Sequence, residues 1–380
     1  MKKITIISAH EGAATWVSMC RLIDETTRYR IRSFHQYDDN GYRSARSAWE
    51  RFVLRIKTFA IFPIRFILHA EQIVKESDVL LVVTSPFFMP VLVSMVTKRK
   101  NVKAIALMND IYPEALVAKG MVKRGGSVEH FIKKAFSNAL PKMGSVVFIT
   151  EHHRALVSNA VGNSVKSVVI PVSAYSDPFQ NTPPGCVDGP IQITYCGTLG
   201  LMHDTATFLE WFDSVNYCED LRFVFHTSGA SKDKFEAEIR RRTVNRQFCP
   251  KISLGHALHE EEWVRLMRAS QVGLVFQNED SDDVIFPSKV ASILASGQAV
   301  LAVADERSEL ARIIVDNDCG WVVQPQDVEK FSDCIATLLQ PDVLLRKRKN
   351  AFELGQRVFG KDAVAARWVQ LFDGVFLDAA

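Results

Sequence analysis

The sequence lacks the cysteine patterns of disulfide-rich and zinc-binding proteins. Its seven cysteines are odd in number, form no Cys-x-x-Cys pair and mostly lie in apolar stretches. We therefore expect reduced thiols in a core, without disulfides or zinc, and a cytoplasmic location. What remains is an ordinary composition for a soluble protein, with 47% hydrophobic and 23% charged residues.

The sequence also has no convincing export signal or membrane span. Only four apolar residues precede Ser8, which is too short for the apolar core of a signal peptide. Residues 79–96 form an almost wholly apolar run of 18 residues, but the run contains Pro86 and Pro90. It is better explained as a buried strand, a turn and a buried helix.

Charge is divided unevenly along the chain. A chain of 380 residues is longer than one typical domain, so two domains are expected. Residues 1–180 carry 25 Lys and Arg against 14 Asp and Glu, a net charge of +11, whereas residues 181–380 carry 21 against 29, a net charge of −8. The basic part is expected to face something anionic, such as lipid headgroups, nucleic acid or a phosphorylated substrate.

Short β-branched runs alternate with helical segments in both halves of the chain. This alternation predicts an α/β fold with two Rossmann-like, doubly wound parallel sheets. The expected strands cover residues 3–8, 29–34, 78–84, 102–109, 145–150 and 167–172, and then 191–200, 222–229, 250–257, 272–277, 299–305 and 320–325. Ligands of such folds bind at the carboxyl edges of the strands, so the site is expected between two domains.

A linker is predicted between the two series of strands. Residues 173–190 concentrate Pro, Gly, Ser and Asp and show no periodicity. We therefore predict a first domain at residues 1–175 and a second at residues 190–355. Residues 356–380 place apolar side chains at helical intervals, which predicts a final amphipathic helix that packs back toward the first domain.

One lysine stands at the start of a predicted helix. Phe286, Pro287, Ser288 and Lys289 lead into a short helix of small residues that Gly297 ends, with Pro287 expected at the first helical position. The free N–H groups and positive dipole end of a helix, joined by an ammonium, can hold a phosphate or diphosphate without a metal. The alternative is a well-formed helix start with a solvated lysine.

A second candidate phosphate-binding element closes the first strand of the second domain. In YCGTLGLMHD, residues 195–204, Gly197 and Gly200 form a turn that lets a ligand approach the backbone closely. The Gly-x-Gly-x-x-Gly fingerprint of dinucleotide sites is absent. The alternative is a plain turn, because glycines are common at strand ends.

Together these segments resemble family 4 glycosyltransferases. The likeness lies in the run from Phe286 to Asp327, in YCGTLG upstream and in MNDIYPEAL at residues 108–116, and it extends over nearly the whole chain. It is strongest to the branch that builds bacterial surface polysaccharides such as O-antigen, capsule or exopolysaccharide. The resemblance implies a GT-B fold, a nucleotide-diphosphate sugar donor held mainly by the second domain, and transfer with retention of anomeric configuration.

The resemblance also implies roles for individual residues. The candidate catalytic residues are Asp110, which would face the reacting sugar, and Lys289, which would hold phosphate together with nearby helix amides. Positions matched to donor binding are His10, Gly12, Gly197, Thr198, Gly200, His203, Gly229, His256, Ala257, Phe286, Pro287, Ser288, Ser292 and Glu309. Among them, the backbone near His256 and Ala257 matches the place where the family holds the base.

The sequence departs from its relatives at several of these positions. Many relatives carry two glutamates ahead of the small-residue helix, and the second usually binds ribose, but this chain has Val284 and Ser292 there. Relatives often place Arg and Lys after the first glycine turn, where this chain has Thr198 and His203. Lys289 is thus left as the main fixed cation.

Neither a metal nor a cofactor is expected. Asp280, Asp282 and Asp283 come close to a metal-binding run, but their acid-rich surroundings are more simply explained as a solvated loop. N–H groups and cations placed in advance would instead stabilise the departing nucleotide diphosphate.

The basic residues of the first half of the chain indicate how the protein reaches a sugar acceptor. Residues 42–69 predict an amphipathic helix that Pro63 interrupts, resting on anionic lipid. Its membrane-facing residues are expected to be Trp49, Arg51, Phe52, Arg55 and Ile56. A core-facing helix with a solvated basic back is the alternative. Membrane docking would place the protein peripherally on the inner face of the plasma membrane, where a lipid-linked saccharide acceptor lies.

The leading hypothesis is therefore a glycosyltransferase that moves a sugar from a nucleotide donor to a lipid-linked saccharide. A nucleotide-sugar epimerase on the same fold is a second hypothesis, against which the basic helices count. A non-catalytic partner of a membrane complex is a third, favoured by the missing family carboxylates. Nucleic-acid binding is least expected, because no aromatic stacking platform or reading motif accompanies the basic residues.

Overall fold

The structure is a computed structural model. It describes residues 1–11, 14–37, 48–100, 102–161, 165–180, 182–186, 189–200, 202–215, 220–244, 250–278 and 285–377. The chain divides into two compact units. Unit 1 comprises Met1–Ser173 and Asp362–Ala380, and unit 2 comprises Ala174–Lys361.

Unit 1 is built on a six-stranded parallel sheet in the order β2-β1-β3-β4-β5-β6. Its strands are β1 Lys2–Ile7, β2 Tyr29–Phe34, β3 Val79–Val83, β4 Lys103–Met108, β5 Ser145–Phe148 and β6 Ser167–Val169. Its helices are α1 Ala14–Thr26, α3 Ala48–Ile56, α4 Phe62–Lys75, α5 Met89–Lys100, α6 Glu114–Ala118, α7 Ser127–Ala139, α8 Glu151–Val161 and α16 Lys361–Leu377, with a 3₁₀ turn at Leu140–Lys142.

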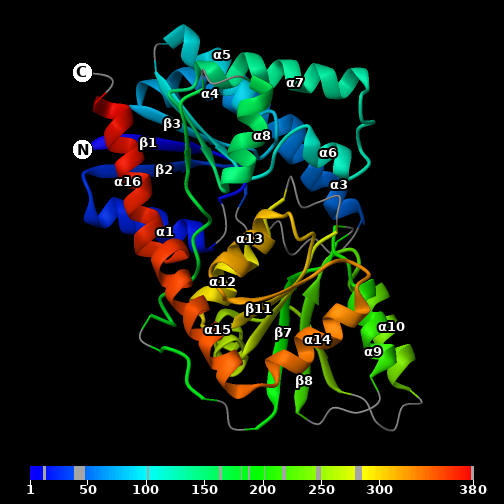
Figure 1. Cartoon of the computed structure of the whole chain (residues 1–380). Helices are drawn as coiled ribbons and strands as arrows, with labels where there is room; N and C mark the ends of the chain where they lie inside the picture. Colours follow the sequence, from blue (N-terminus) through cyan, green and yellow to red (C-terminus); the bar gives the residue numbers. More distant parts are fainter. Residues whose placement is uncertain are drawn as a thin grey trace. The chain divides into compact units, whose positions relative to one another are not determined.

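Helices α4, α5 and α7 form a layer on one face of this sheet. Phe66 of α4, Val93 of α5 and Phe136 of α7 share one hydrophobic core with strand residues. Helix α5 packs against both α4 and α7 (Figure 1). This arrangement follows from β-branched runs that are buried on both faces of a parallel sheet and must be covered by helices.

The last helix, α16, belongs to the core of unit 1. The ring of Trp368 meets that of Trp16 edge to face, with centroids 5.3 Å apart. Phe372 and Phe376 contact the ring of Tyr29 in β2, and α16 lies beside α1 and β2 in Figure 1. Helix α16 therefore packs onto α1 and β2 as part of the core of unit 1.

The apolar run at residues 79–96 is a strand, a turn and a helix, as predicted. Strand β3 ends at Val83 and α5 begins at Met89. Over the described part of the chain, no helix combines the length and apolar character needed to cross a bilayer.

The predicted interruption at Pro63 is wrong. Helix α3 continues through a π-helical turn, Lys57–Ile61, directly into α4. Pro63 lies in the first turn of α4 and is buried. Proline has no N–H to donate, and the π turn before it, in which the Phe62 amide donates to the Lys57 carbonyl oxygen, lets the helix continue past Pro63.

Unit 2 repeats the architecture with a second parallel sheet, in the order β12-β11-β10-β7-β8-β9. Its strands are β7 Ile191–Thr198, β8 Leu221–Ser228, β9 Lys251–Gly255, β10 Val272–Phe276, β11 Ala299–Val303 and β12 Gly320–Val323. Its helices are α9 Ala206–Ser214, α10 Lys232–Thr243, α11 Glu260–Ala269, α12 Lys289–Ala295, α13 Glu309–Asp316, α14 Val328–Leu338 and α15 Pro341–Leu354, followed by a π turn at Gly355–Phe359. All twelve predicted strands are thus confirmed within a few residues.

The core of unit 2 is unusually aromatic. The ring of Phe208 in α9 lies 5.2 to 5.9 Å from those of Trp211, Phe223 and Phe225. All four side chains are almost fully buried. Rings at these separations add to the stabilisation that their burial gives.

Replacing Phe208 with Ala is expected to destabilise unit 2 by about 3 to 5 kcal/mol, because a buried ring is lost and a cavity remains. Urea unfolding followed by tryptophan fluorescence measures this loss. Val315→Ala, at a position 67% exposed on α13, serves as the control and should change the unfolding free energy little. Equal effects of the two substitutions would contradict the role of the aromatic cluster.

Candidate functional site

The carboxyl end of β7 holds the turn predicted from Gly197 and Gly200. Gly197 adopts φ of +147°, and Gly229, at the end of the neighbouring strand, adopts φ of +97°. A Cβ on Gly229 would lie 2.4 Å from the carbonyl oxygen of Leu199 and 2.6 Å from a side-chain carbon of Thr198. Glycine at position 229 is therefore required for the β8 turn to pack against the β7 turn.

Lys289 is the first residue of α12. Ser288 precedes it at the cap position, and Gly297, with φ of +72°, follows the end of the helix. The predicted place of Pro287 is wrong, because it lies two residues before the helix rather than at its first position. Asp280, Asp282, Asp283 and Val284, which precede this segment, lie outside the described residues.

The ammonium of Lys289 is enclosed by the end of β7. Its Nζ lies 3.7 Å from the centroid of the Tyr195 ring, and a Cβ on Gly197 would stand 3.3 Å from it. Although part of the residue reaches the surface, the nitrogen is buried, and within the described residues it has no hydrogen-bond partner. The alternative of a solvated lysine is therefore wrong.

Burial lowers the pKa of Lys289 to about 7. The charged form loses its hydration, and the face of the Tyr195 ring returns only part of that energy. The nearby Cys196 thiol has a pKa raised by burial to about 11, so it carries no charge to pair with the ammonium near neutral pH. A buried ammonium without a hydrogen-bond partner among the described residues is costly unless an anion or a polar group pairs with it.

His203 contacts the glycine turn at Gly200. Its Nδ1 accepts a hydrogen bond from the Gly200 amide over 3.1 Å. Burial, and then the charge of Lys289, lower the pKa of His203 to about 4. The ring is therefore neutral at physiological pH. Nδ1 also lies 3.3 Å from the Gly200 carbonyl oxygen, so both backbone groups of Gly200 face this nitrogen. The structure thus brings Lys289, Gly197, Gly200 and His203 together.

The remaining predicted residues of unit 2 lie on several neighbouring elements, most of them at element ends. His256 and Ala257 are exposed just after β9, where the His256 carbonyl accepts from Nδ1 of His226 and its ring contacts Lys232. Phe286 is buried. Thr198 is exposed, Ser292 lies within α12, and Glu309 begins α13 behind a Ser308 cap.

Two predicted residues, Asp110 and His10, belong to unit 1. Asp110 follows β4, and its carboxylate accepts a hydrogen bond from the Tyr112 hydroxyl over 3.3 Å. Burial raises its pKa, against the opposing charge of Lys119. His10 follows β1 and pairs with Tyr37 in an isolated bridge. Gly12 lies outside the described residues.

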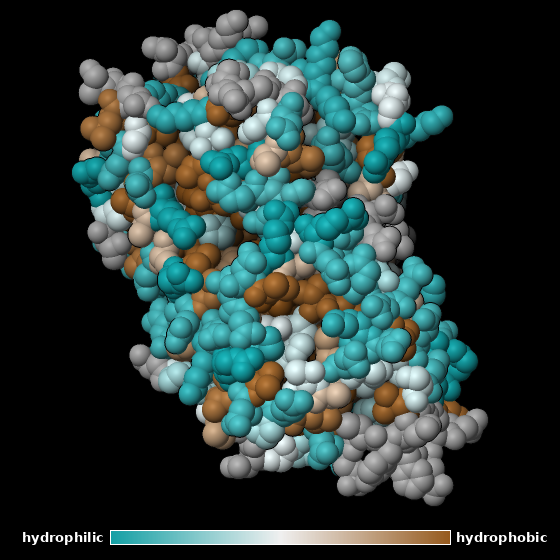
Figure 2. Space-filling view, viewed as in Figure 1, coloured by the Kyte–Doolittle hydropathy of each residue, from teal (hydrophilic) through white to brown (hydrophobic). Residues whose placement is uncertain are grey.

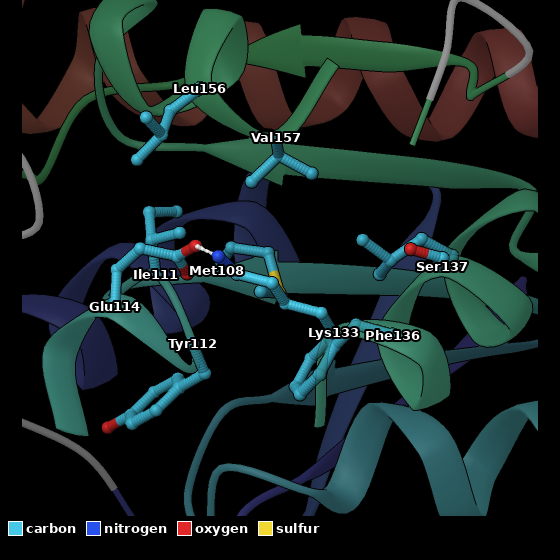
Figure 3. A pocket seen from close by; sticks show the side chains of 10 residues that line it. Met108, Ile111, Tyr112, Glu114, Lys133, Phe136, Ser137, Leu156 and Val157 are labelled. Atoms are coloured by element: carbon cyan, nitrogen blue, oxygen red, sulfur yellow. Dashed lines mark ion pairs between the residues drawn. The ribbon is translucent and has the colours of Figure 1, made fainter. Parts of the chain in front are cut away.

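A small pocket of about 80 Å³ lies beside the loop that carries Asp110. It is mostly apolar, and an ion pair between Glu114 and Lys133, 3.4 Å apart, stands on its wall (Figure 3). Its lining residues are Met108, Ile111, Tyr112, Glu114, Lys133, Phe136, Ser137, Leu140, Leu156 and Val157. The pocket is too small for a nucleotide sugar.

The α3 face predicted to contact lipid is exposed. Trp49, Phe52 and Ile56 are 70%, 51% and 42% exposed, and Arg55 is exposed beside them. The alternative of a core-facing helix is therefore wrong for α3, whereas α4, which continues it, buries Phe62 and Phe66 in the core. The side chain of Arg51 lies outside the described part of the structure.

Sequence reasoning missed two residues of the site, Tyr195 and Cys196. Both stand in the same quoted segment as Gly197, and a strand that delivers a glycine turn also delivers the side chains before it. Tyr195 is fully buried, and its hydroxyl donates to the carbonyl oxygen of Thr198 over 2.7 Å. It therefore both fixes the turn and supports the ammonium.

Comparisons with known proteins agree with this arrangement. No family model matches the sequence. The chain is similar to the Probable glycosyltransferase WbjE of Pseudomonas aeruginosa, with 23% identity over 279 residues that cover 71% of this chain and 68% of that protein. It is also similar in structure to sucrose-phosphate synthase from Thermosynechococcus elongatus, with a TM-score of 0.70, 15% identity and 100% of both chains covered.

A further similar structure is HepE of Anabaena in complex with UDP-glucose. The TM-score is 0.66 at 10% identity, over 98% of this chain and 100% of that chain. The chain has the GT-B fold of glycosyltransferases. The predictions of a GT-B fold and of similarity to glycosyltransferases are thus confirmed.

The pKa of Lys289 predicts the direction in which the free energy of unfolding of this GT-B protein changes with pH. Its pKa is lowered from 10.5 to about 7 on folding, so the unfolded chain binds more protons between these values. The free energy of unfolding should therefore rise with pH across this window, by up to about 1.4 kcal/mol per unit, and be flat in this term below pH 7.

Lys289→Met removes this titration while keeping the length and apolar stem of the side chain. The difference in unfolding free energy between wild type and variant should shift in favour of wild type from pH 7 to pH 10, and below pH 7 the variant should be the more stable. Chemical denaturation at several pH values measures it. Parallel pH profiles for the two proteins would contradict the enclosed ammonium.

Proposed function

We propose that this chain is a retaining glycosyltransferase that moves a sugar from a nucleotide-diphosphate donor to a lipid-linked saccharide. The observation that carries the proposal is the enclosed Lys289 ammonium, which has no hydrogen-bond partner among the described residues, set against a glycine turn in a GT-B fold. The curated relative and the similar structures support it, since they are glycosyltransferases and one holds UDP-glucose.

In this proposal the donor diphosphate lies against Lys289 and the turn from Gly197 to Gly200. The bond between the anomeric carbon and the diphosphate oxygen breaks, and a bond to the acceptor hydroxyl oxygen forms. The acceptor proton leaves with the departing diphosphate, and the sugar keeps its configuration. Negative charge grows on the diphosphate as positive charge grows on the sugar. A protonated Lys289 in a low-dielectric setting would stabilise the negative charge on the diphosphate.

Asp110 is proposed to act on the sugar. Its carboxylate would stabilise the positive charge that develops at the anomeric carbon. Burial raises the pKa of this group, so the charged form is held in place chiefly by Lys119 and the Tyr112 hydroxyl. A carboxylate that is expensive to keep charged gains most from meeting a cation, which in this reaction exists only near the transition state.

The rest of the donor is proposed to lie along the strand ends of unit 2. His256 and Ala257 would offer backbone groups to the base. Ser292 would face the ribose in place of the glutamate that relatives usually carry, and Glu309 would belong to the donor site. No metal takes part in this proposal, because the ammonium and backbone N–H groups supply the positive charge that the diphosphate needs.

The acceptor is proposed to reach the enzyme at a membrane. The exposed apolar and basic residues of α3 would rest on anionic lipid at the inner face of the plasma membrane. A lipid-linked saccharide in that membrane then needs no soluble carrier. The pathway would be the synthesis of a surface polysaccharide.

Donor binding tests the role of Lys289. Wild-type protein heated with UDP-, ADP- and GDP-sugars should show a rise in melting temperature with one nucleotide series. Lys289→Met should weaken that binding by roughly ten- to a hundredfold, as expected for one charge-assisted contact. Lys330→Met, on the exposed surface of the same unit, should bind like wild type. A variant that binds the donor unchanged would overturn the proposal.

Asp110→Asn should keep donor binding and lose transfer. The expected loss in turnover is at least about a hundredfold, as for removal of one group that stabilises charge in the transition state. Release of nucleoside diphosphate in the presence of a bacterial membrane-lipid extract measures it. Asp78→Asn, at the amino end of β3 on the opposite edge of the same sheet, is the control. Full activity in the Asp110 variant would remove Asp110 from the reaction.

A further inference from the structure

The helix layer of unit 1 exposes apolar side chains well beyond α3. In α4, Ile64, Ile67 and Leu68 are 57%, 56% and 75% exposed, while Phe62, Phe66 and Ile73 on the opposite face are buried. In the adjacent α5, Met95 is 59% exposed. Figure 2 shows hydrophobic residues in brown among hydrophilic ones in teal over the visible surface of both units. An exposed apolar surface that runs across neighbouring helices usually marks an interaction site.

The segment from α6 to α7 continues this pattern with three further residues. Met121 in the connecting loop is 72% exposed, and Val128 and Phe131 on the first turns of α7 are 57% and 72% exposed. Val128 and Phe131 are three residues apart, so they share one face of the helix. Ile132 and Phe136, on the other face, are buried in the core.

The loop that carries Met121 is held in a fixed shape. The Met121 amide donates a hydrogen bond to the carbonyl oxygen of Leu116 over 2.9 Å. Gly120 and Gly125 adopt φ of +67° and +73°, which closes the loop at both ends. The Glu129 carboxylate accepts from the Gly125 amide and pairs with Lys133. The fold therefore presents Met121 at the surface instead of letting it turn inward.

Basic residues surround these three apolar residues. Lys119, Lys123, Arg124 and Lys134 are all exposed. Between residues 119 and 134 there are five Lys and Arg against one acid, Glu129, and that acid is buried. Exposed cations beside exposed Met, Val and Phe fit an anionic bilayer, because long basic side chains reach headgroups while apolar ones enter the acyl boundary.

We infer that the α6–α7 segment is a second membrane contact, which binds anionic lipid through Met121, Val128 and Phe131 with Lys123 and Arg124. The inference rests on the proposed function in one respect, the membrane location of the acceptor. Helix α5, with Met95 exposed on it, lies between α4 and α7 in the layer. Helix α4, which continues α3 through the π turn, and α7 thus belong to one helix layer of unit 1.

Vesicle co-sedimentation tests this contact with the full chain. The probe is vesicles of phosphatidylethanolamine and phosphatidylglycerol in equal amounts, compared with phosphatidylcholine vesicles. Met121→Glu with Phe131→Glu should lower affinity for the anionic vesicles by roughly ten- to a hundredfold, the effect of withdrawing large apolar side chains from the bilayer. Lys123→Gln and Arg124→Gln should each lower it about fivefold at low salt and leave binding to phosphatidylcholine unchanged.

A matched control is Val315→Glu, an equally exposed apolar position on a helix of unit 2, which should bind vesicles like wild type. Melting temperatures should stay equal across the set, because all these side chains are exposed. If the α7 variants bind like wild type while Phe52→Glu in α3 does not, the second contact is overturned and the first stands. If wild type binds no vesicles, or if the α7 variants lose self-association instead, the surface serves a protein and the inference fails.

Donor binding separates this inference from the proposed function. Wild type that is stabilised by a nucleotide sugar but does not bind vesicles would leave the glycosyltransferase intact and remove the membrane contact. Wild type that binds vesicles through α7 but responds to no nucleotide sugar would support the membrane contact and contradict the proposed glycosyltransferase.

Discussion

The enclosure of the Lys289 ammonium is the constraint on which the site in unit 2 depends. A long, flexible lysine would normally carry its charge into water, and the surrounding packing prevents it. A Cβ on Gly273 of β10 would lie 2.4 Å from Ile293, and one on Gly355 would lie 2.4 Å from the backbone of Ala295. Helix α12 is thus clamped on both sides by close backbone approach, and its first residue is directed over the Tyr195 ring.

The same packing explains why the cost of that enclosure is tolerated. Tyr195 stacks on Phe276 with ring centroids 5.3 Å apart, and this ring pair is part of the aromatic core of unit 2. Burying the ammonium without a hydrogen-bond partner among the described residues costs free energy, and the packing of this aromatic core offsets that cost. An anion placed against Lys289 would reduce the cost, because binding would pair the charge in addition to making a contact.

Much of the fold could be predicted from sequence, because parallel strands buried on both faces are continuous β-branched runs, as in VLLVV of β3 and AVLAV of β11. The helix start at Lys289 was also visible. Its burial was not, because it depends on Tyr195 and His203, some 90 residues away. The exposure of Phe131 was hidden for a similar reason: it stands next to Ile132, and only the packed layer shows which of two adjacent apolar residues faces out.

The burial of Lys289 matters more because the second half of the chain is net negative. Residues 181–380 carry a net charge of −8, which at long range repels a nucleotide diphosphate. Charges in water are screened over about 8 Å at physiological salt, whereas a buried charge is screened far less. Within contact distance, one enclosed ammonium therefore outweighs a larger number of solvated carboxylates. Placed on the surface, the same lysine would be one weak term in an unfavourable sum. Under the proposed function, its enclosure is what would let a chain with few cations near its glycine turn hold a diphosphate.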